Sequence, residues 1–464
     1  MFAMHGGSSP LSGHATDIRV PSGGGVTASI TVPRRISRTG RTDIRFSPLP
    51  LSIDEYVTPT LAAKATSAQQ TQLYINFILS AIPCYFKVTE TRVSINWVEY
   101  VDARRGGSGS PFDWAIRSLT TIYTGSLHND PRLLEAGREL YIRSLRGLFG
   151  LLGEINSAKS DEAIATAISL TVFEMHSCTN SQGWIHHATG IWTLMRLRGP
   201  QAHLHGFGRA CYIACRNLLV TTALVSQEEC FLAEPEWQAL NEQIAADNAK
   251  QPNSSVYTDI TERAFREVVK LPGFVKRMCS LSSSVPDVQT RERSVLLREI
   301  LATRASLRGI YTEFGVSVSA LRAGYESQSE VFIGPMPHHF FDGFTSLSIR
   351  GIRSGILLLN YLIILLDPSQ RAAAEAENCI ITDRMQDCQS SHSRSSLDHP
   401  SPALTSPGSP GRPRLLIQSR ITPETREAPT SDWMDRIATT MGMDGVRVTL
   451  VDEEYEGKET ETGV

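Results

Sequence analysis

Apolar residues recur at steps of three and four along most of this chain, and this is the period of an amphipathic helix. One such series consists of Trp184, Ala188, Ile191 and Met195. The Gly199-Pro200 pair that follows is a helix stop signal. The next predicted helix begins near Gly206, and its apolar positions are Phe207, Cys211, Ala214, Leu218 and Val225. Arg209 and Arg216 fall on other faces of that helix, so it is predicted to be amphipathic and packed.

The segment Asn129-Asp130-Pro131 predicts the start of a long helix, with Asp130 as its cap and Pro131 in its first turn. Gly153 can end this helix. Apolar residues recur along it at the helical period of 3.6 residues. They predict a continuous apolar face formed by Leu134, Tyr141, Leu145, Leu148 and Leu152.

Further helices are predicted throughout the chain, at 66–82, 161–178, 184–197, 206–226, 235–247, 259–270, 290–317, 340–366 and 372–386. Only VRVTLV, at 446–451, alternates well enough to predict a short strand. The fold class predicted from this pattern is all-α, a stack of antiparallel helices joined by short polar connections.

Composition divides the chain into four parts. Residues 1–65 form a Gly/Ser/Pro-rich basic tail that is predicted to be disordered, and 66–388 form the helical body. Residues 389–413 are a Ser/Pro-rich linker, also predicted to be disordered. In the last part, 414–464, the spacing of Trp433, Ile437 and Met441 predicts a helix that folds back onto the body, and the acidic run after Asp452 is predicted to stay solvated.

The order of residues in 184–240 resembles the regulatory helical domain of fungal-specific transcription factors, which usually follows a binuclear zinc cluster. In that family a His and a small residue precede the first helix, and an Arg-Gly-Pro sequence ends it. A Phe-x-Arg sequence then begins the next helix, and a Phe-Leu-x-x-Pro-x-Trp corner follows. The matching residues here are His187, Ala188, Gly190, Arg198, Gly199, Pro200, Phe207, Arg209, Arg216, Phe231, Leu232, Pro235 and Trp237. Segments 73–86, 133–152, 356–366 and 432–448 are similar to other helices of that domain. The resemblance implies a regulator, and none of these motifs is catalytic.

The cysteines separate this chain from a complete zinc-cluster factor. A binuclear cluster needs six thiolates close together in sequence, because they must surround two metal ions in tetrahedral geometry. The eight cysteines are scattered, and none precedes Cys84. The DNA-reading part of the resembling family is therefore missing here, through true loss, truncation or a wrongly chosen start codon. Scattered cysteines in apolar patterns favour reduced thiols in the nucleus or cytosol.

The charge of the chain gives no strong field for nucleic acid, since its formal net charge is −3. Local basic character is confined to the tail, at Arg19, Arg34, Arg35, Arg38, Arg41 and Arg45. A solvated tail is the favoured interpretation, with nuclear import or nonspecific DNA contact as the alternative. The N-terminus lacks a signal-peptide pattern, and Ile356–Leu366 is too short to span a bilayer, so an intracellular protein without a membrane segment is expected.

For each possible metal ligand, a structural role is favoured over metal binding. Cys211 and Cys215, with His203 or His205, would make a half-site, but cysteines on an apolar helical face favour core packing. The adjacent pair His186-His187 cannot chelate together on a helix, and His176 lies ten residues earlier. The pair His338-His339 has no nearby carboxylate or thiol.

Two other patterns also favour structural roles. The GGSGS run at 106–110, beside Arg104 and Arg105, lacks the ending of a phosphate-binding loop and is predicted to connect two helices. The acidic pairs Asp161-Glu162 and Glu228-Glu229 fall at helix ends, where the first pair is explained by capping. The sequence therefore predicts no catalytic, cofactor-binding or metal-ligating residue, no cofactor, and no ligand-binding residue that can be named.

The functional hypothesis is a transcriptional regulator of the fungal type, nuclear or nucleocytoplasmic, that controls a metabolic or biosynthetic pathway. Its expected partners are other transcription factors or the transcription machinery, together with a small-molecule effector, and it is not expected to read DNA by itself. The alternative is a protein-interaction module or co-regulator derived from a truncated zinc-cluster factor. An enzyme without a familiar motif is a third alternative, and the sequence offers no converging nucleophile and base to favour it.

Overall fold

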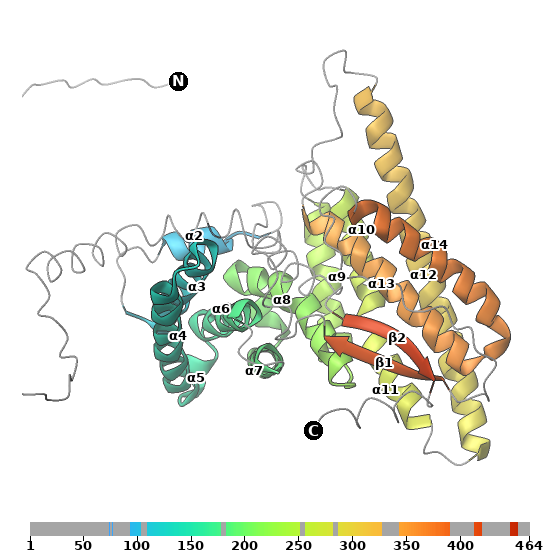
Figure 1. Ribbon diagram of the computed structural model, residues 1–464, viewed down its shortest axis with the longest axis horizontal. Helices are drawn as coiled ribbons and strands as arrows, with labels where there is room; N and C mark the ends of the chain where they lie inside the picture. The colour runs from blue at the N-terminus through green and yellow to red at the C-terminus, as the bar shows by residue number, and fades with distance from the viewer. Residues whose placement is uncertain are drawn as a thin grey trace, which may run out of the picture. The chain divides into compact units, whose positions relative to one another are not determined.

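The computed structural model describes residues 74, 77, 93–103, 109–177, 182–250, 256–281, 286–326, 343–389, 413–419 and 446–452 (Figure 1). Helices dominate these residues, so the predicted all-α class is confirmed. The elements described belong to one compact unit of the chain, Thr60–Val464. The predicted disorder of the 1–65 tail and of most of the 389–413 linker lies outside the described residues, as do Trp433, Ile437, Met441 and the acidic end.

The elements before Lys250 are helices and two short 3-10 turns. They are α2 (Trp97–Asp102), α3 (Pro111–His128), α4 (Pro131–Leu152), α5 (Ile155–Ala158), α6 (Asp161–Ser177), α7 (Gly183–Arg198), the 3-10 turn η2 (Pro200–His203), α8 (Gly206–Val225), η3 (Phe231–Ala233) and α9 (Pro235–Ala249). Tyr74 and Phe77 are also helical and buried, and they fall within the predicted 66–82 helix, the rest of which lies outside the described residues.

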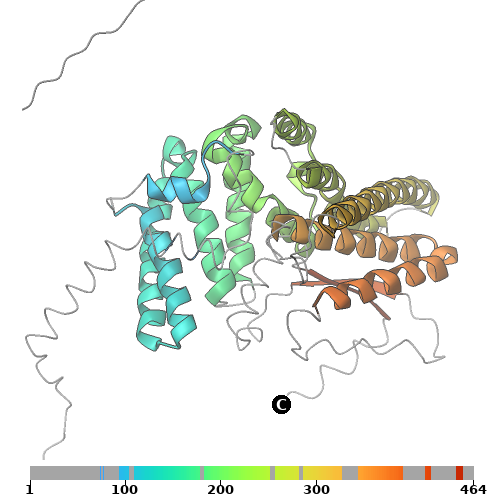
Figure 2. The same cartoon turned by 90° about the horizontal axis from the view of Figure 1, so that it is seen from above.

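The elements after Lys250 are helices followed by a two-stranded sheet. They are α10 (Val256–Val268), α11 (Leu271–Leu281), α12 (Pro286–Glu326), α13 (Gly343–Leu366), the 3-10 turn η5 (Pro368–Gln370), α14 (Arg371–Gln389), β1 (Pro413–Ser419) and β2 (Val446–Asp452). Figure 2 shows α12, α13 and α14 running alongside one another, and contacts join α13 to both of its neighbours.

The α3–α4 hairpin begins and ends where its capping residues stand. Ser110 caps α3, and Asp130 caps α4 by accepting a hydrogen bond from the backbone N–H of Arg132, as predicted. Asn129 turns the chain between the helices in the left-handed conformation, with φ of 51°. Helix α3 was not predicted. Its centre is rich in β-branched residues, which are weak helix formers, and burial against α4 and α6 stabilises it.

Helix α4 buries less of its apolar face than its sequence pattern predicts. Leu148 is buried, and Leu134 and Tyr141 are partly buried against the core. Leu145 and Leu152, however, are exposed, so the predicted apolar face is packed against the core over only part of its length. The buried face of α4 is instead rotated toward Gly137 and Ser144, and the hydroxyl of Ser144 donates to the carbonyl of Pro111 on α3.

Helix α8 is buried on nearly every side, whereas the sequence predicted an amphipathic helix with polar faces. All residues from Phe207 to Leu224 are buried, including Arg209 and Arg216. The reason is that α2, α6, α7, α11, η2 and the sheet all contact this helix (Figure 1). Its charged side chains therefore need partners from other elements.

Helix α13 is apolar enough over Ile349–Leu366 to cross a membrane by length and composition, which is a longer window than the predicted 356–366 segment. Of this window, 61% is buried inside the protein. Asn360 is fully buried there and accepts a hydrogen bond from Arg304 at 2.9 Å, while its amide donates to Asn378 at 2.8 Å. These contacts are those of a helix packed in the core of the protein.

The sheet consists of β1 and β2 in antiparallel register, from Pro413 opposite Asp452 to Ser419 opposite Val446. The strand predicted at 446–451 is confirmed, and it replaces the C-terminal end of the helical segment expected at 432–448. Strand β1 was missed, because its apolar residues are consecutive and show no alternation. Both strands contact α8 and α13, so the sheet covers part of the helical core.

Candidate functional site

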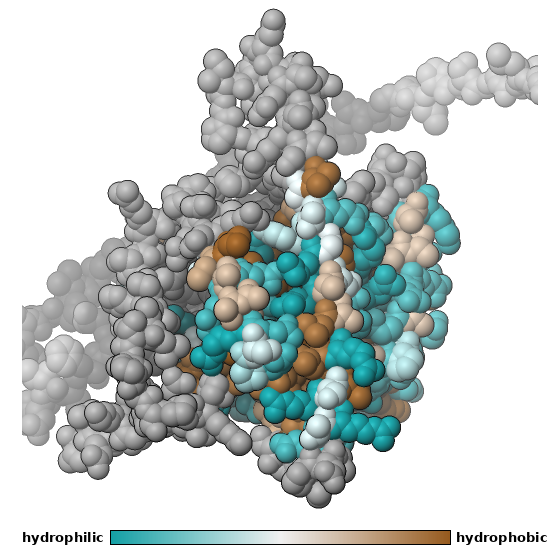
Figure 3. All heavy atoms as spheres, turned by 90° about the vertical axis from the view of Figure 1, so that its right-hand side faces the viewer, coloured by the Kyte–Doolittle hydropathy of each residue, from teal (hydrophilic) through white to brown (hydrophobic). Residues whose placement is uncertain are grey.

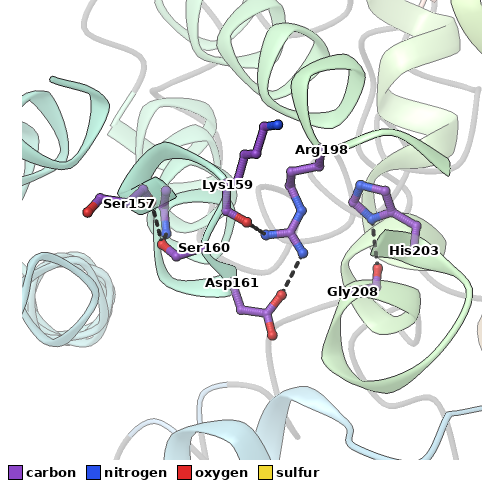
Figure 4. Close-up of polar contacts among 8 residues, drawn as sticks. Ser157, Lys159, Ser160, Asp161, Arg198, His203 and Gly208 are labelled. Carbon is purple, nitrogen blue, oxygen red and sulfur yellow. Dashed lines mark hydrogen bonds and ion pairs between the residues drawn. The ribbon is translucent and has the colours of Figure 1, made fainter. Parts of the chain in front are cut away.

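The Arg-Gly-Pro sequence ends α7 and ties it to the start of α6. Gly199 has φ of 75° and ψ of 164°, a conformation that only glycine adopts readily, and Pro200 then begins η2. The Arg198 side chain turns back and donates to the carbonyl of Lys159 at 2.7 Å and to the carboxylate of Asp161 at 2.6 Å (Figure 4). This arginine is only 4% exposed. Asp161 thus has a second role beyond the predicted one in the first turn of α6.

The turn η2 packs directly on the start of α8. His203 is fully buried, and its Nδ1–H donates to the carbonyl of Gly208 at 3.1 Å (Figure 4). Burial lowers the pKa of His203 to about 4, so the ring is neutral near pH 7. A Cβ atom at Gly208 would overlap the carbonyl oxygen of Ala202. Glycine is therefore required where the two backbones meet.

Arg209 holds α8 to the end of α9. Its Nε donates to the carbonyl of Leu204 and its Nη2 to the carboxylate of Asp247, both at 2.6 Å. The hydrogen bond from Arg209 lowers the pKa of Asp247. The neighbouring Phe207 stacks on Tyr100 of α2 with a ring-centroid distance of 3.5 Å. The Phe-x-Arg start of α8 therefore contacts helices on two sides.

Among the ion pairs of the described residues, the one that Arg216 forms is the most deeply buried. Its two Nη atoms donate to the two carboxylate oxygens of Glu262 on α10 at 2.6 and 2.9 Å, and the arginine and glutamate side chains are 0% and 1% exposed. Nη1 also donates to Asn241 of α9 at 3.1 Å. The guanidinium lies 4.4 Å from the ring centroid of Phe265. One arginine thus joins α8, α9 and α10.

The Pro-Trp corner closes the same region with aromatic contacts. Pro235 begins α9, and Trp237 is 2% exposed. The Trp237 ring lies 4.8 Å from Phe231 in an edge arrangement and 5.7 Å from His203, measured between centroids. The Pro-Trp corner, η2 and α8 therefore pack together as one unit.

These residues make a structural site, because each cation meets a carboxylate from another helix. The sequence resemblance had singled out Arg198, Arg209 and Arg216. Their partners Asp161, Asp247 and Glu262 were not paired with them by sequence reasoning. No periodicity could have paired them, since the partners lie 37, 38 and 46 residues away.

The histidines weighed as metal ligands do not come together. His187 hydrogen bonds through Nε2 to the hydroxyl of Tyr141 at 2.8 Å, and that hydroxyl also bonds to the buried carboxylate of Glu174. Burial raises the pKa of Tyr141 and lowers that of His187. His176 is buried beside Tyr123, and His186 is exposed.

The cysteines of α8 lie in the core. Cys211 and Cys215 are fully buried, and the Cys215 thiol donates to the carbonyl of Cys211. Burial raises the pKa of Cys215 to about 12, so its thiol is protonated. Within the residues that the structure describes, no three His, Cys, Asp or Glu side chains are grouped so that they could hold a metal ion. His338 and His339 lie outside those residues.

The remaining candidates from the sequence that the structure describes have structural partners. Ser110, the last residue of the GGSGS run, caps α3, and the carbonyl of Gly109 accepts a hydrogen bond from the Trp114 indole at 2.9 Å. Residues 104–108 lie outside the described part. Glu228 pairs with Lys276 at 2.9 Å on the surface.

Comparison with known proteins found a relative along nearly the whole chain. Over 407 residues the chain is 53% identical to "Uncharacterized protein AN5342" of Emericella nidulans, which covers 88% of this chain and 86% of that protein. No family model matches the chain, and no solved structure matches it. At this identity and coverage, the chain belongs to the same protein family as AN5342 of Emericella nidulans.

Proposed function

We propose that this protein is a nuclear transcriptional regulator of the fungal-specific type, whose helical body acts through protein contacts. The observation that carries the proposal is the segment Trp184–Trp237. The residues by which it resembles the fungal regulatory domain are also those that join its helices, through Arg198, Arg209 and Arg216. A fold alone does not fix a function, so the proposed regulatory role rests on the resemblance of these residues to the fungal regulatory domain.

The proposed mechanism follows from what the body offers chemically. Its buried cations are neutralised by carboxylates and its buried thiols are protonated, so this core is suited to a rigid scaffold. A partner transcription factor that contacts DNA is part of this proposal. A small effector and a biosynthetic target pathway belong to the same proposal. The relative from Emericella nidulans, a fungus, agrees with the fungal character of the resemblance.

A second candidate is a protein-interaction module or co-regulator derived from a zinc-cluster factor. The exposed apolar residues of α4 favour it, because apolar side chains that gather on a surface mark contact sites. The two candidates predict different effects of removing the protein. Loss of a regulator changes the transcripts that it controls, whereas loss of a co-regulator changes only the target genes of its one partner factor.

The proposal is tested by tagging the chromosomal gene with a fluorescent protein and, separately, by deleting it and sequencing the transcripts. We expect nuclear fluorescence and a restricted set of changed transcripts, which return to normal when the wild-type gene is restored. A protein excluded from nuclei, together with an unchanged transcriptome under growth conditions in which the gene is expressed, would overturn the proposal. Changes confined to the targets of a single co-purifying factor would favour the co-regulator.

A further inference from the structure

Three polar side chains from three helices meet in one hydrogen-bonded chain, which we call the α4–α6–α7 junction. The hydroxyl oxygen of Tyr141 on α4 lies 2.8 Å from Nε2 of His187 on α7. The same hydroxyl bonds to the carboxylate of Glu174 on α6. A histidine, which can gain a proton, is therefore linked through one phenol to a buried acid.

Aromatic packing holds this junction in place. The Tyr141 ring stacks on Phe173 of α6 with a centroid distance of 4.4 Å and an interplanar angle of 15°. It meets the His187 ring edge-on, at 6.0 Å between centroids. Glu174 is 5% exposed. Because turning either ring would break these contacts, a change of charge at His187 acts on all three helices.

His187 differs from the other motif histidine in its access to solvent. His187 is half-buried, whereas His203 is 0% exposed and its ring is held between η2 and α8. Histidine is the side chain whose ordinary pKa lies between about pH 5 and 8. His187 can therefore take up a proton while the protein stays folded, but His203 needs the structure around it to open.

The groups that act on the charge of His187 come from each helix of the junction. Tyr141 lies on α4, Glu174 on α6, and the neighbouring His186 on α7 itself. Burial lowers the pKa of His187, the charge of Glu174 raises it and His186 lowers it, and burial has the largest effect. The folded protein therefore binds this proton less readily than the unfolded chain does.

The other elements that contact α7 direct their charged groups to different partners. In η2, His203 bonds to the carbonyl of Gly208. In α8, Arg209 bonds to Asp247 and Arg216 to Glu262. The charge of His187 is therefore set within the α4–α6–α7 junction.

The helices after Lys250 differ from this junction in their ionisable groups. Figure 3 shows the face around α12 and α14, where hydrophobic residues are interspersed among many hydrophilic ones. Ion pairs of these helices, such as Arg308 with Glu377, join groups whose ordinary pKa values lie outside the range from about pH 5 to 8. The described residues after Lys250 contain no histidine. Among the described residues, a response to mild acid therefore belongs to the helices before Lys250.

We propose that His187 is a proton sensor in the folded protein, and that its protonation in mild acid loosens the junction of α4 with α6 and α7. The neutral ring suits a junction that the protein mostly encloses, whereas a cation there loses part of its hydration. The attraction of Glu174 offsets only part of that loss, because the phenol of Tyr141 lies between the two groups in the chain. The consequence is a local opening of α4 before the whole protein unfolds.

The pH window follows from the direction of the pKa shift. Above the ordinary histidine value of 6.5, the ring is neutral in both the folded and the unfolded states, and the junction has its full stability. As the pH falls below that value, the unfolded chain takes up the proton first, so stability is lost until the pH passes the lower pKa of the folded protein. His203, with a pKa of about 4, adds to the same loss, so the test compares variants at equal pH.

The test follows the amide hydrogen exchange of α4, Pro131–Leu152, in the full chain at about pH 7.5 and about pH 5.5. His187→Gln keeps an uncharged hydrogen-bonding group for Tyr141 and cannot take up a proton. The ratio of wild-type to variant exchange rates should be at least about twofold higher at the acidic pH. Comparing two proteins at one pH cancels the intrinsic effect of pH on exchange.

The matched control is His186→Gln, the same replacement one residue earlier, at an exposed position outside the hydrogen-bonded chain. It should keep the acid response of the wild type. The proposal is overturned if His187→Gln responds to acid as the wild type does. It is also overturned if acid slows α4 exchange in the wild type relative to His187→Gln, because the attraction of Glu174 would then outweigh burial.

A second measurement follows the titration of His187 itself by nuclear magnetic resonance of ring-labelled histidine. Its signal is the one lost in His187→Gln. The midpoint should lie below 6.5 in the wild type, and lower still in Glu174→Gln, because the charge that favours protonation is removed. A wild-type midpoint at or above 6.5 would contradict the proposal whatever the exchange rates show.

Discussion

Buried arginines set the character of this core at the level of single residues. An arginine taken from water into a protein interior is costly unless a carboxylate accepts its hydrogen bonds. Arg216 meets this condition with two bonds to Glu262 and one to Asn241. Such a pair adds less to stability than a packed apolar pair would, but its loss on one side leaves a charge stranded. Its main effect is to specify which helices meet.

Arg216→Ala should lower the free energy of unfolding by about 3–5 kcal/mol, because the carboxylate of Glu262 would remain buried without its cation. The double replacement Arg216→Met with Glu262→Leu should recover most of that loss. Urea unfolding followed by circular dichroism measures both values.

Arg263 provides the matched control for this experiment. It pairs with Glu313 on the surface, where the two side chains are 32% and 46% exposed. Arg263→Ala should therefore cost at most about 1 kcal/mol. If Arg216→Ala and Arg263→Ala cost the same, the buried pair does not have the role assigned to it.

Residue types were easier to predict from the sequence than residue partners. The importance of Arg198, Arg209 and Arg216 was visible in the sequence, whereas their carboxylates lie on other helices at separations without periodic meaning. The bond from His187 to Tyr141, 46 residues away, was hidden for the same reason. Tertiary packing, which a single sequence does not display, decides these pairings.

At the level of elements, boundaries with a local chemical signal were predictable. Asp130 with Pro131, and Gly199 with Pro200, gave the start of α4 and the end of α7. The helices α3 and α11 and the strand β1 were missed, because their stability comes from neighbours rather than from a local pattern. The burial of α8 was missed as well, since arginines in a sequence pattern indicate a solvated face.

The close approach of η2 to α8 makes a prediction at this level. Gly208→Ala should destabilise the protein by several kcal/mol or prevent folding, because its Cβ would overlap the carbonyl oxygen of Ala202 in backbone that cannot simply turn away. The matched control is Gly190→Ala in α7, where no atom lies within 4 Å of the new Cβ. That variant should gain roughly 0.5–1 kcal/mol, because alanine favours helix.

Thermal unfolding of the two glycine variants, with soluble yield as a second readout, separates these outcomes. A Gly208→Ala protein as stable as the wild type would show that η2 and α8 are not held together at this point. A loss of stability in Gly190→Ala would show that the exposed side of α7 is covered in the folded protein.

At the level of the whole molecule, the described residues form a helical body with a two-stranded sheet packed on it. Its motif residues join helices to one another, through the pairs that Arg198, Arg209 and Arg216 form with carboxylates on other helices.

The most direct measurement of the central claim fuses this chain to an unrelated DNA-binding domain that carries a nuclear import signal, with its binding sites beside a reporter gene. The account predicts that reporter transcription changes several-fold, upward or downward, relative to the DNA-binding domain alone. The change should be lost with Arg216→Ala, which disrupts the body. A folded fusion that occupies the reporter sites and leaves its transcription unchanged would contradict the account.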